Sequence, residues 1–421
     1  MKYAVLLLAV SCSLSALHAQ WLETTIQLSP ASGPSAFCYN SHDNKVYCAI
    51  TGHDSVVVVD GQTNQVVTTI PTGDVPFALC YGSQNDLIYC ANYRSAKVTV
   101  IDGATNQVVR AVSTGNGPRD VCYNSQGNKV YCANSEDNTV SVIDCASNDV
   151  IATVSVGAGP SVLGYNPRDN KVYCGNVFGD SVTVIDGTSD HVIAWLPAAS
   201  PWAFCHNIQN DRIYCAEYGG RVVVIDGVTD EVITNVTAGE TPDALCYNSH
   251  DNRVYSANLA SEDVSVIDGA TNEVIATVAV GYAPWAVCYN PENNKVYCAS
   301  YEAVTVIDGT SSQVLRTIGV GTNPISLCHN PLQNRVYVAN YDGSSISVLR
   351  DSMTGVEERP KPYASSRKLE ATVILTLPVG AVAFDAMGRR VVSPRPGVYF
   401  VRDEGRGAGD VGRTRKIVMT R

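Results

Sequence analysis

Long apolar runs are missing from this 421-residue chain, and apolar residues nowhere follow helical spacing. A helix that spans a bilayer needs about 20 apolar residues, whereas the longest run here extends only from Ala4 to Val10. That run follows Lys2 and precedes small residues with a plausible cleavage point after Ala19, which is the pattern of a secretory signal. We therefore expect residues 1–19 to be a signal peptide and the chain to have no membrane span.

Motifs that carry catalysis or bind metals are also missing. The sequence has no Walker loop, no Gly-x-Ser-x-Gly, no His-Glu-x-x-His and no Cys-x-x-Cys. None of the six histidines after the leader has the spacing of a metal ligand or of a catalytic triad, and His42 and His250 are expected in solvent. The sequence thus predicts no catalytic residue, no cofactor and no metal site.

Basic residues are scarce in the first 350 residues, which hold 16 Lys and Arg against 32 Asp and Glu, a net charge of −16. Residues 351–421 hold 13 against 8, a net charge of +5. Nucleic-acid binding relies on clustered Lys and Arg, so the acidic part predicts a soluble surface and no nucleic-acid partner. The basic C-terminal part is expected to be a separate element.

Repetition is what the sequence has in abundance. A unit of about 42 residues occurs eight times, and its clearest stretch is Lys45-Val-Tyr-Cys-Ala followed by a run of valines that ends at Asp60. The equivalent residue is Arg350 in the eighth copy and an aspartate in the others: Asp102, Asp144, Asp186, Asp226, Asp268 and Asp308. Self-similarity at this period indicates stacked supersecondary units.

Each unit contains four short segments of strand composition separated by Gly, Pro, Asn and Asp. A four-stranded sheet covered on both faces by its neighbours is the blade of a β-propeller. Only seven fourth strands follow the eight copies of the first three, and Leu22-Glu-Thr-Thr-Ile26 resembles Val66-Val-Thr-Thr-Ile70. We therefore predict an all-β, eight-bladed propeller over residues 20–350 whose ring is closed by residues 21–28, with seven blades as the alternative. The recurring aspartate is expected to form a turn.

Two parts of the sequence resemble known families, the repeat and the C-terminal segment. Lys-Val-Tyr-Cys-Ala-Asn and Thr-Val-Ser-Val-Ile-Asp resemble the YVTN class of propeller repeats, a class that implies a binding or scaffolding module. The segment Gly397-Val-Tyr-Phe-Val-Arg402 with the later Lys416-Ile-Val resembles the C-terminal sorting domain of type IX secretion cargo. This second resemblance implies a linker over 351–370 and, over 371–421, a small module of four strands that acts as an export address. A small accessory β module without a transport role is the alternative.

Thirteen cysteines occupy two repeat positions ten residues apart, as Cys38 and Cys48 do in the first unit. A ladder of disulfides between neighbouring strands would explain the spacing. However, Cys174, Cys246 and Cys328 stand without a cysteine at the partner position. Because the two positions vary independently, the sequence favours free thiols packed between blades.

Loops between the second and third strands, and between blades, differ in every unit, and they should share one face of the ring. We call this face the variable-loop face, and we expect binding residues there. Directly after the loop prolines, the chain presents five residues that should surround the mouth of the central channel: Phe77, Arg119, Trp202, Asp243 and Trp285. Four further aromatic residues, the outer tyrosines, are expected outside them: Tyr93, Tyr218, Tyr301 and Tyr341. Packing between blades is the alternative for the two tryptophans.

These features together favour a secreted or cell-surface propeller that binds a carbohydrate, a peptide or a protein and performs no chemistry. The secretion machinery would be a second partner, through the C-terminal module. Without a sorting role for that module, the protein would be periplasmic. The competing hypothesis is a propeller enzyme, such as a quinoprotein-like dehydrogenase subunit or a lactonase, because propeller sites assemble from several blades and leave no local motif.

Overall fold

The computed structural model describes residues 20–351 without a gap and five short strands between residues 372 and 419. These residues form two compact units, and the predicted signal peptide and linker lie outside the described residues. Within the described residues every regular element is a strand except a single 3-10 turn, η1 (Thr51–His53). No helix among them is long and apolar enough to cross a membrane.

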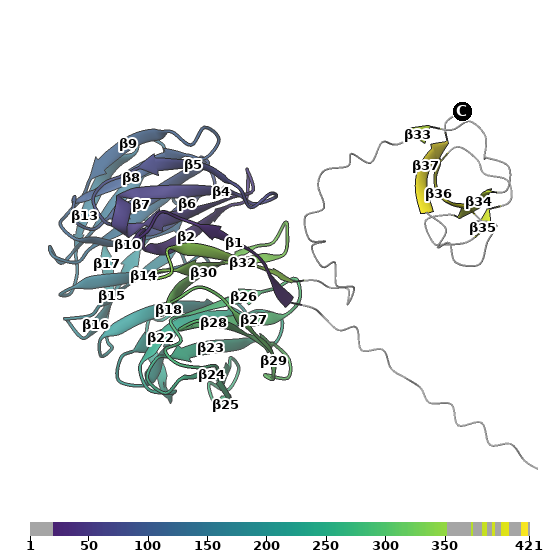
Figure 1. Ribbon diagram of the computed structural model, residues 1–421. Coiled ribbons are helices and arrows are strands. Elements are labelled where there is room, and N and C mark those ends of the chain that lie inside the picture. Colours follow the sequence, from purple (N-terminus) through teal and green to yellow (C-terminus); the bar gives the residue numbers. More distant parts are fainter. Residues whose placement is uncertain are drawn as a thin grey trace, which may run out of the picture. The chain divides into compact units, whose positions relative to one another are not determined.

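The larger unit consists of eight four-stranded antiparallel sheets, which confirms the predicted eight blades (Figure 1). Blades 1 to 4 comprise β2 (Pro34–Asn40), β3 (Lys45–Ile50), β4 (Ser55–Asp60), β5 (Val66–Pro71); β6 (Pro76–Gly82), β7 (Leu87–Asn92), β8 (Lys97–Asp102), β9 (Val108–Ser113); β10 (Pro118–Asn124), β11 (Lys129–Asn134), β12 (Thr139–Asp144), β13 (Asp149–Ser155); and β14 (Pro160–Asn166), β15 (Lys171–Asn176), β16 (Ser181–Asp186), β17 (Val192–Pro197). Blades 5 to 8 comprise β18 (Pro201–Asn207), β19 (Arg212–Glu217), β20 (Arg221–Asp226), β21 (Val232–Thr237); β22 (Pro242–Asn248), β23 (Arg253–Asn258), β24 (Asp263–Asp268), β25 (Val274–Ala279); β26 (Ala286–Asn290), β27 (Lys295–Ser300), β28 (Ala303–Asp308), β29 (Val314–Gly319); and β30 (Pro324–Asn330), β31 (Arg335–Asn340), β32 (Ser345–Asp351), β1 (Gln20–Gln27).

The N-terminal strand closes the ring as predicted. β1 pairs antiparallel with β32, so the eighth blade takes its fourth strand from the start of the propeller. Arg335 reinforces this junction, because its Nε and Nη2 donate to the two carboxylate oxygens of Glu23, each at 2.6 Å. The inner strands β2 and β30 also lie side by side. In this arrangement β1 covers the edge of β32 that would otherwise be open to pairing with another chain.

The second strand of each blade supplies the core. In β3, Val46, Tyr47, Cys48 and Ala49 are all fully buried, since both faces of the strand are covered by neighbouring blades. Each equivalent tyrosine is likewise fully buried: Tyr89, Tyr131, Tyr173, Tyr214, Tyr255, Tyr297 and Tyr337. The repeat thus places one large amphipathic ring in every gap between blades, with its hydroxyl as a polar handle.

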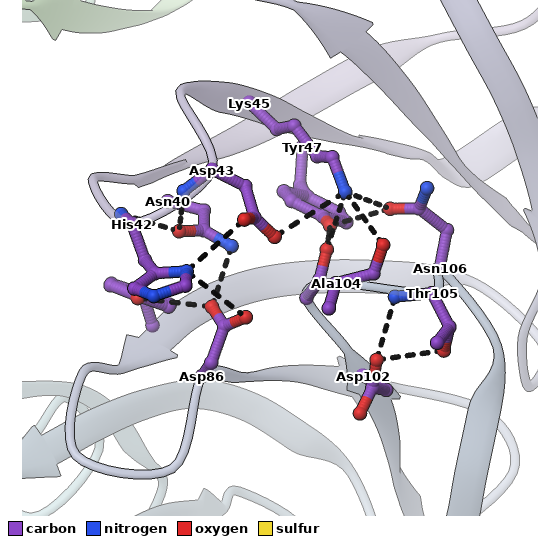
Figure 2. A network of polar contacts seen from close by, with 12 residues as sticks. Asn40, His42, Asp43, Lys45, Tyr47, Asp86, Asp102, Ala104, Thr105 and Asn106 are labelled. Atoms are coloured by element: carbon purple, nitrogen blue, oxygen red, sulfur yellow. Dashed lines mark hydrogen bonds and ion pairs between the residues drawn. The ribbon is translucent and has the colours of Figure 1, made fainter.

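The tyrosine hydroxyls connect each blade to the next, as Figure 2 shows for blades 1 and 2. Tyr47 Oη donates to Asn106 Oδ1 at 2.7 Å, in the turn between the third and fourth strands of blade 2. Lys45 Nζ donates to the carbonyl oxygens of Gly103 and Ala104 in the same turn, at 2.6 and 3.1 Å. A basic side chain and a tyrosine therefore hold the neighbouring turn from one strand.

The recurring aspartates form these turns, as the sequence predicts. Asp102 Oδ1 accepts hydrogen bonds from the backbone N–H and the hydroxyl of Thr105, both at 2.7 Å. These bonds, the hydroxyl bond first, lower the pKa of Asp102 below its usual value. Asn106 follows with φ of +59°, a conformation that asparagine tolerates.

The cysteines of each hairpin do not face one another. In blade 1, Cys38 pairs with Tyr47, and Phe37 pairs with Cys48. Because neighbouring residues of a strand point to opposite faces, the two cysteines lie on opposite sides of the sheet. All fourteen cysteines of residues 20–351 are free, and the register excludes the disulfide ladder within blades.

The C-terminal unit is a five-stranded sheet with the order β33-β37-β36-β34-β35. Its strands are β33 (Thr372–Val373), β34 (Ala381–Phe384), β35 (Arg390–Val391), β36 (Gly397–Asp403) and β37 (Thr414–Met419). The prediction of four strands is wrong by one, because the two residues of β33 add a parallel edge strand beside β37. The segments that resemble a sorting domain, β36 and β37, are antiparallel neighbours.

Candidate functional site

The predicted mouth residues lie on the first strand of their blades or in the loop before it. Phe77, Arg119, Trp202 and Asp243 follow the first residues of β6, β10, β18 and β22. The first strands of consecutive blades contact one another around the whole ring. These side chains therefore start from equivalent positions around the propeller axis, on the face where the first strands begin.

Arg119 brings three of the mouth residues together. Its guanidinium carbon lies 5.5 Å from the ring centroid of Phe77 in blade 2 and 5.5 Å from that of Trp202 in blade 5. Blade 4, between Arg119 and Trp202, presents only Ser161 at this position, so a small side chain leaves room for the guanidinium to pass. Both distances are within the range of cation–π attraction, which is about 6 Å.

Aromatic contacts extend this cluster outward. Phe77, which is 40% exposed, has its ring centroid 6.3 Å from that of Tyr93 in the next loop of the same blade. The indole Nε1 of Trp202 is buried and has no hydrogen-bond partner in the described part of the chain. Such a buried donor is costly to leave unpaired.

Asp243 and Asp120 add two carboxyl groups of unusual basicity. Burial raises the pKa of Asp243 to about 6. Burial also raises the pKa of Asp120 to about 6, against the effect of backbone N–H donors from Leu163 and Val121. Those donors occupy both oxygens of Asp120, at 2.7 and 2.8 Å, so this carboxylate stabilises the junction of blades 3 and 4.

The remaining predicted residues are spread around the rim. Tyr218 and Tyr301 are exposed, and Tyr341 lies against Gly33 of blade 1. Trp285 is half-buried, and its backbone N–H donates to the carbonyl oxygen of Ala299. The structure therefore gathers Phe77, Tyr93, Arg119 and Trp202 into one cluster by ring contacts, and neither these four residues nor Asp243 takes part in those contacts.

Sequence reasoning missed three residues near this face. Tyr282 stacks edge-on with Tyr301 at a centroid distance of 5.9 Å, and Phe178 is 79% exposed. Both lie in variable loops, so the loop comparison could have found them. Asp120 could have been noticed because six of the other blades have alanine or valine at its position, where the seventh has Ser326.

Two pockets lie elsewhere on the propeller. One of about 420 Å³ includes Leu28, His53 and Asp54 near the ring closure. The other, of about 340 Å³, includes Glu217 and Arg221 of blade 5. Neither is lined by any of the predicted mouth residues.

Comparisons with known proteins identify the fold and no closer relationship. No protein-family model and no curated protein matches the chain. Among solved structures, the computationally designed Ika8 protein is similar with a TM-score of 0.66 and 18% identity, covering 78% of this chain and 99% of its own. Sqt1 of Saccharomyces cerevisiae has a TM-score of 0.70 at 10% identity, and Kuenenia stuttgartiensis hydrazine synthase 0.55 at 17%; each match covers 79% of this chain and 99% of the other. At such identities the likeness shows the β-propeller fold alone.

Proposed function

We propose that this protein is a non-catalytic binding module whose ligand docks on the variable-loop face, at the cluster of Phe77, Tyr93, Arg119 and Trp202. The observation that carries the proposal is the position of the Arg119 guanidinium between two aromatic rings from blades 2 and 5. A fully charged group and flat apolar faces are thereby presented together on a rigid ring. Binding sites commonly combine these elements, with few but oriented polar groups.

The ligand class that suits this cluster is a carbohydrate, a peptide or a loop of a protein. Aromatic rings stack on sugar or side-chain faces, and the guanidinium of Arg119 can orient polar groups. An enzymatic role is the competing hypothesis. It is less well supported because backbone N–H groups hold both oxygens of Asp120 in a structural role between blades 3 and 4, which leaves Asp243 as the one carboxyl group of the pair without such donors.

Binding can be tested with glycan and peptide arrays probed with the labelled full-length chain. Arg119→Ala and Trp202→Ala should each weaken the signal at least about tenfold, since each removes a central anchor. Ile208→Ala is the matched control, because Ile208 is exposed in a hairpin turn at the opposite ends of the strands. Equal binding by all three variants, or no binding to either array, would contradict the proposal.

Delivery to the cell surface is the second part of the proposal, with the secretion machinery as partner of residues 371–421. Its support is the pattern of β36 and β37 and the division of the chain into two compact units. Deletion of residues 365–421 should leave the propeller folded but abolish its surface exposure, measured by protease accessibility on intact cells. Unchanged surface delivery would sink this part while leaving the binding site untouched.

A further inference from the structure

A cluster of three metal-ligating side chains lies where the first hairpin turn of blade 1 meets that of blade 2 (Figure 2). His42 Nδ1 is 3.1 Å from Asp43 Oδ1 and 3.8 Å from Asp86 Oδ2. Zinc bonds of about 2.0–2.2 Å in tetrahedral geometry separate neighbouring ligand atoms by roughly 3.3–3.6 Å. The two separations from His42 Nδ1 bracket this value, and all three ligand atoms lie within 4.8 Å of one another, so a cation fits among them after small shifts. We propose that His42, Asp43 and Asp86 bind a divalent transition-metal ion, Zn²⁺ being the ion that suits this nitrogen and oxygen donor set.

Asp86 is held in the orientation that a ligand needs. Its Oδ1 accepts hydrogen bonds from Asn40 Nδ2 at 2.7 Å and from Tyr81 Oη at 3.1 Å. Its Oδ2 is left facing His42. Hydrogen bonds to the oxygen that does not bind the metal are the usual way in which proteins orient carboxylate ligands.

The turn that carries the other two ligands is fixed in the same way. Asn40 Oδ1 accepts the backbone N–H groups of His42 and Asp43, at 2.8 and 3.1 Å. Lys45 Nζ lies 3.4 Å from Asp43 Oδ2, which leaves Asp43 Oδ1 beside the imidazole. Lys45 brings one positive charge against the two carboxylates of Asp43 and Asp86, so the cluster keeps a net negative charge that favours a cation. The His42 side chain is 71% exposed, so the ion can enter from solvent and keep water in its fourth position.

Blades 6 and 7 contain the same arrangement with one ligand replaced. His250 Nδ1 lies 3.0 Å from Asp251 Oδ1, and Asn294 stands where Asp86 stands. Asn294 Oδ1 accepts from Asn248 and Tyr289 at 2.9 and 3.2 Å, which reproduces the bonds to Asp86 Oδ1. Its Nδ2 donates to Asp251 Oδ2 at 2.7 Å and lies 3.4 Å from His250 Nδ1. An amide nitrogen that donates hydrogen bonds is no metal ligand, so this second cluster has only two ligands and serves as a control within the molecule.

The test is a titration of the metal-free full-length chain with Zn²⁺ by calorimetry, with Asp86→Asn and Asn294→Asp as matched variants. The wild type should bind one Zn²⁺ at the cluster, and Asp86→Asn should weaken binding by at least about tenfold, since even partners behind the ligands contribute 10- to 100-fold. Asp86→Asn should fold normally, because Asn294 already occupies the equivalent position, and circular dichroism checks this. Asn294→Asp should raise the stoichiometry to two.

Zinc-edge anomalous scattering from crystals grown with Zn²⁺ locates the ion directly. An ion between His42, Asp43 and Asp86 supports the proposal. An ion bound only at cysteine thiols, no binding by the wild type, wild-type affinity in Asp86→Asn, or an unchanged stoichiometry in Asn294→Asp overturns it.

Discussion

Asp243 shows how burial of one carboxyl group sets a pH dependence. Its pKa rises to about 6 because of burial, while an unfolded chain would have a value of about 3.9. The folded state therefore binds the proton more tightly than the unfolded state. The stability that protonated Asp243 contributes is fully present below about pH 4 and is lost as the pH rises through about 6.

Replacement of Asp243 by Asn should remove this loss of folding stability at higher pH. We expect Asp243→Asn to be more stable than the wild type at pH 7.5 by about 1–2 kcal/mol, below the roughly 3 kcal/mol that a shift of two pKa units represents, because the side chain keeps some exposure. Near pH 4 the two proteins should be equally stable. Urea denaturation at both pH values measures this difference in stability.

Asp102→Asn is the control of opposite sign. The lowered pKa of Asp102 stabilises the fold above the pKa of the unfolded chain, and that stability is lost as the pH falls. Equal midpoints for Asp243→Asn and wild type at pH 7.5 would contradict the prediction.

At the scale of the strand pair, hairpin register decides the chemistry of the cysteines. Cys38 pairs with Tyr47, the residue before Cys48, and Cys48 pairs with Phe37, the residue before Cys38. The two cysteines therefore project to opposite faces of the sheet. Burial also raises the pKa of the thiols, for example that of Cys205 and that of Cys288 to about 12. A thiol that stays protonated is a poor nucleophile, so these groups should be inert in the folded protein.

We expect all fourteen thiols of residues 20–351 to react with an alkylating reagent after denaturation without reductant, and few of them to react in the native protein. Intact mass spectrometry counts the added groups. A parallel sample reduced before denaturation gives the maximum. Ten blocked sulfurs in the unreduced sample would show disulfides and refute the register argument.

At the scale of the whole ring, the carboxylate of Asp351 connects the strands that meet at the closure. Lys295 Nζ donates to its Oδ1 at 2.7 Å, and Tyr297 Oη donates to its Oδ2 at 2.7 Å. Gln20 Nε2 of the N-terminal strand donates to Oδ1 at 3.1 Å. Lys295 and Asp351 are almost completely buried. One carboxylate thus joins blade 7 to β32 and β1, the two strands that close the ring.

Asp351→Ala should lower the free energy of unfolding by about 3–5 kcal/mol, because it leaves the Lys295 ammonium buried without its partner. The double variant Asp351→Ala with Lys295→Met should recover part of this loss, since the unpaired charge is then gone. Denaturation midpoints of the three proteins measure both effects, with Asp102→Ala, a turn within blade 2, as the milder comparison. A single variant as stable as the wild type would show that closure does not rely on this group.

Much of the architecture follows from local patterns. Repeat period, turn residues and strand composition predict eight blades, and the surplus strand at Leu22–Ile26 predicts where the ring closes. The cysteine register was not predictable in the same way, because a shift of one residue reverses the face of every side chain and the hairpin turns decide that shift. The fifth C-terminal strand was missed because two residues carry no pattern.

The candidate sites depend on residues from different blades. Sequence spacing is nearly the same for every pair of equivalent positions, so it cannot say that Arg119 reaches both Phe77 and Trp202, or that Asp86 meets His42. The departures themselves are visible, since Asp86 and His42 differ from most copies of the repeat. Their meeting is not visible, because it needs the lateral packing of neighbouring blades.

The amino-acid sequence therefore established the number of blades and the strands within each, because hydrogen-bonded hairpins form between residues close in the chain. It also predicted the closure by the N-terminal strand, because only seven fourth strands follow the eight copies of the first three. Ring packing established which unlike side chains share a surface, because it brings residues more than 40 positions apart within a few ångströms. The aromatic cluster around Arg119 and the ligands around His42 exist only at that second level.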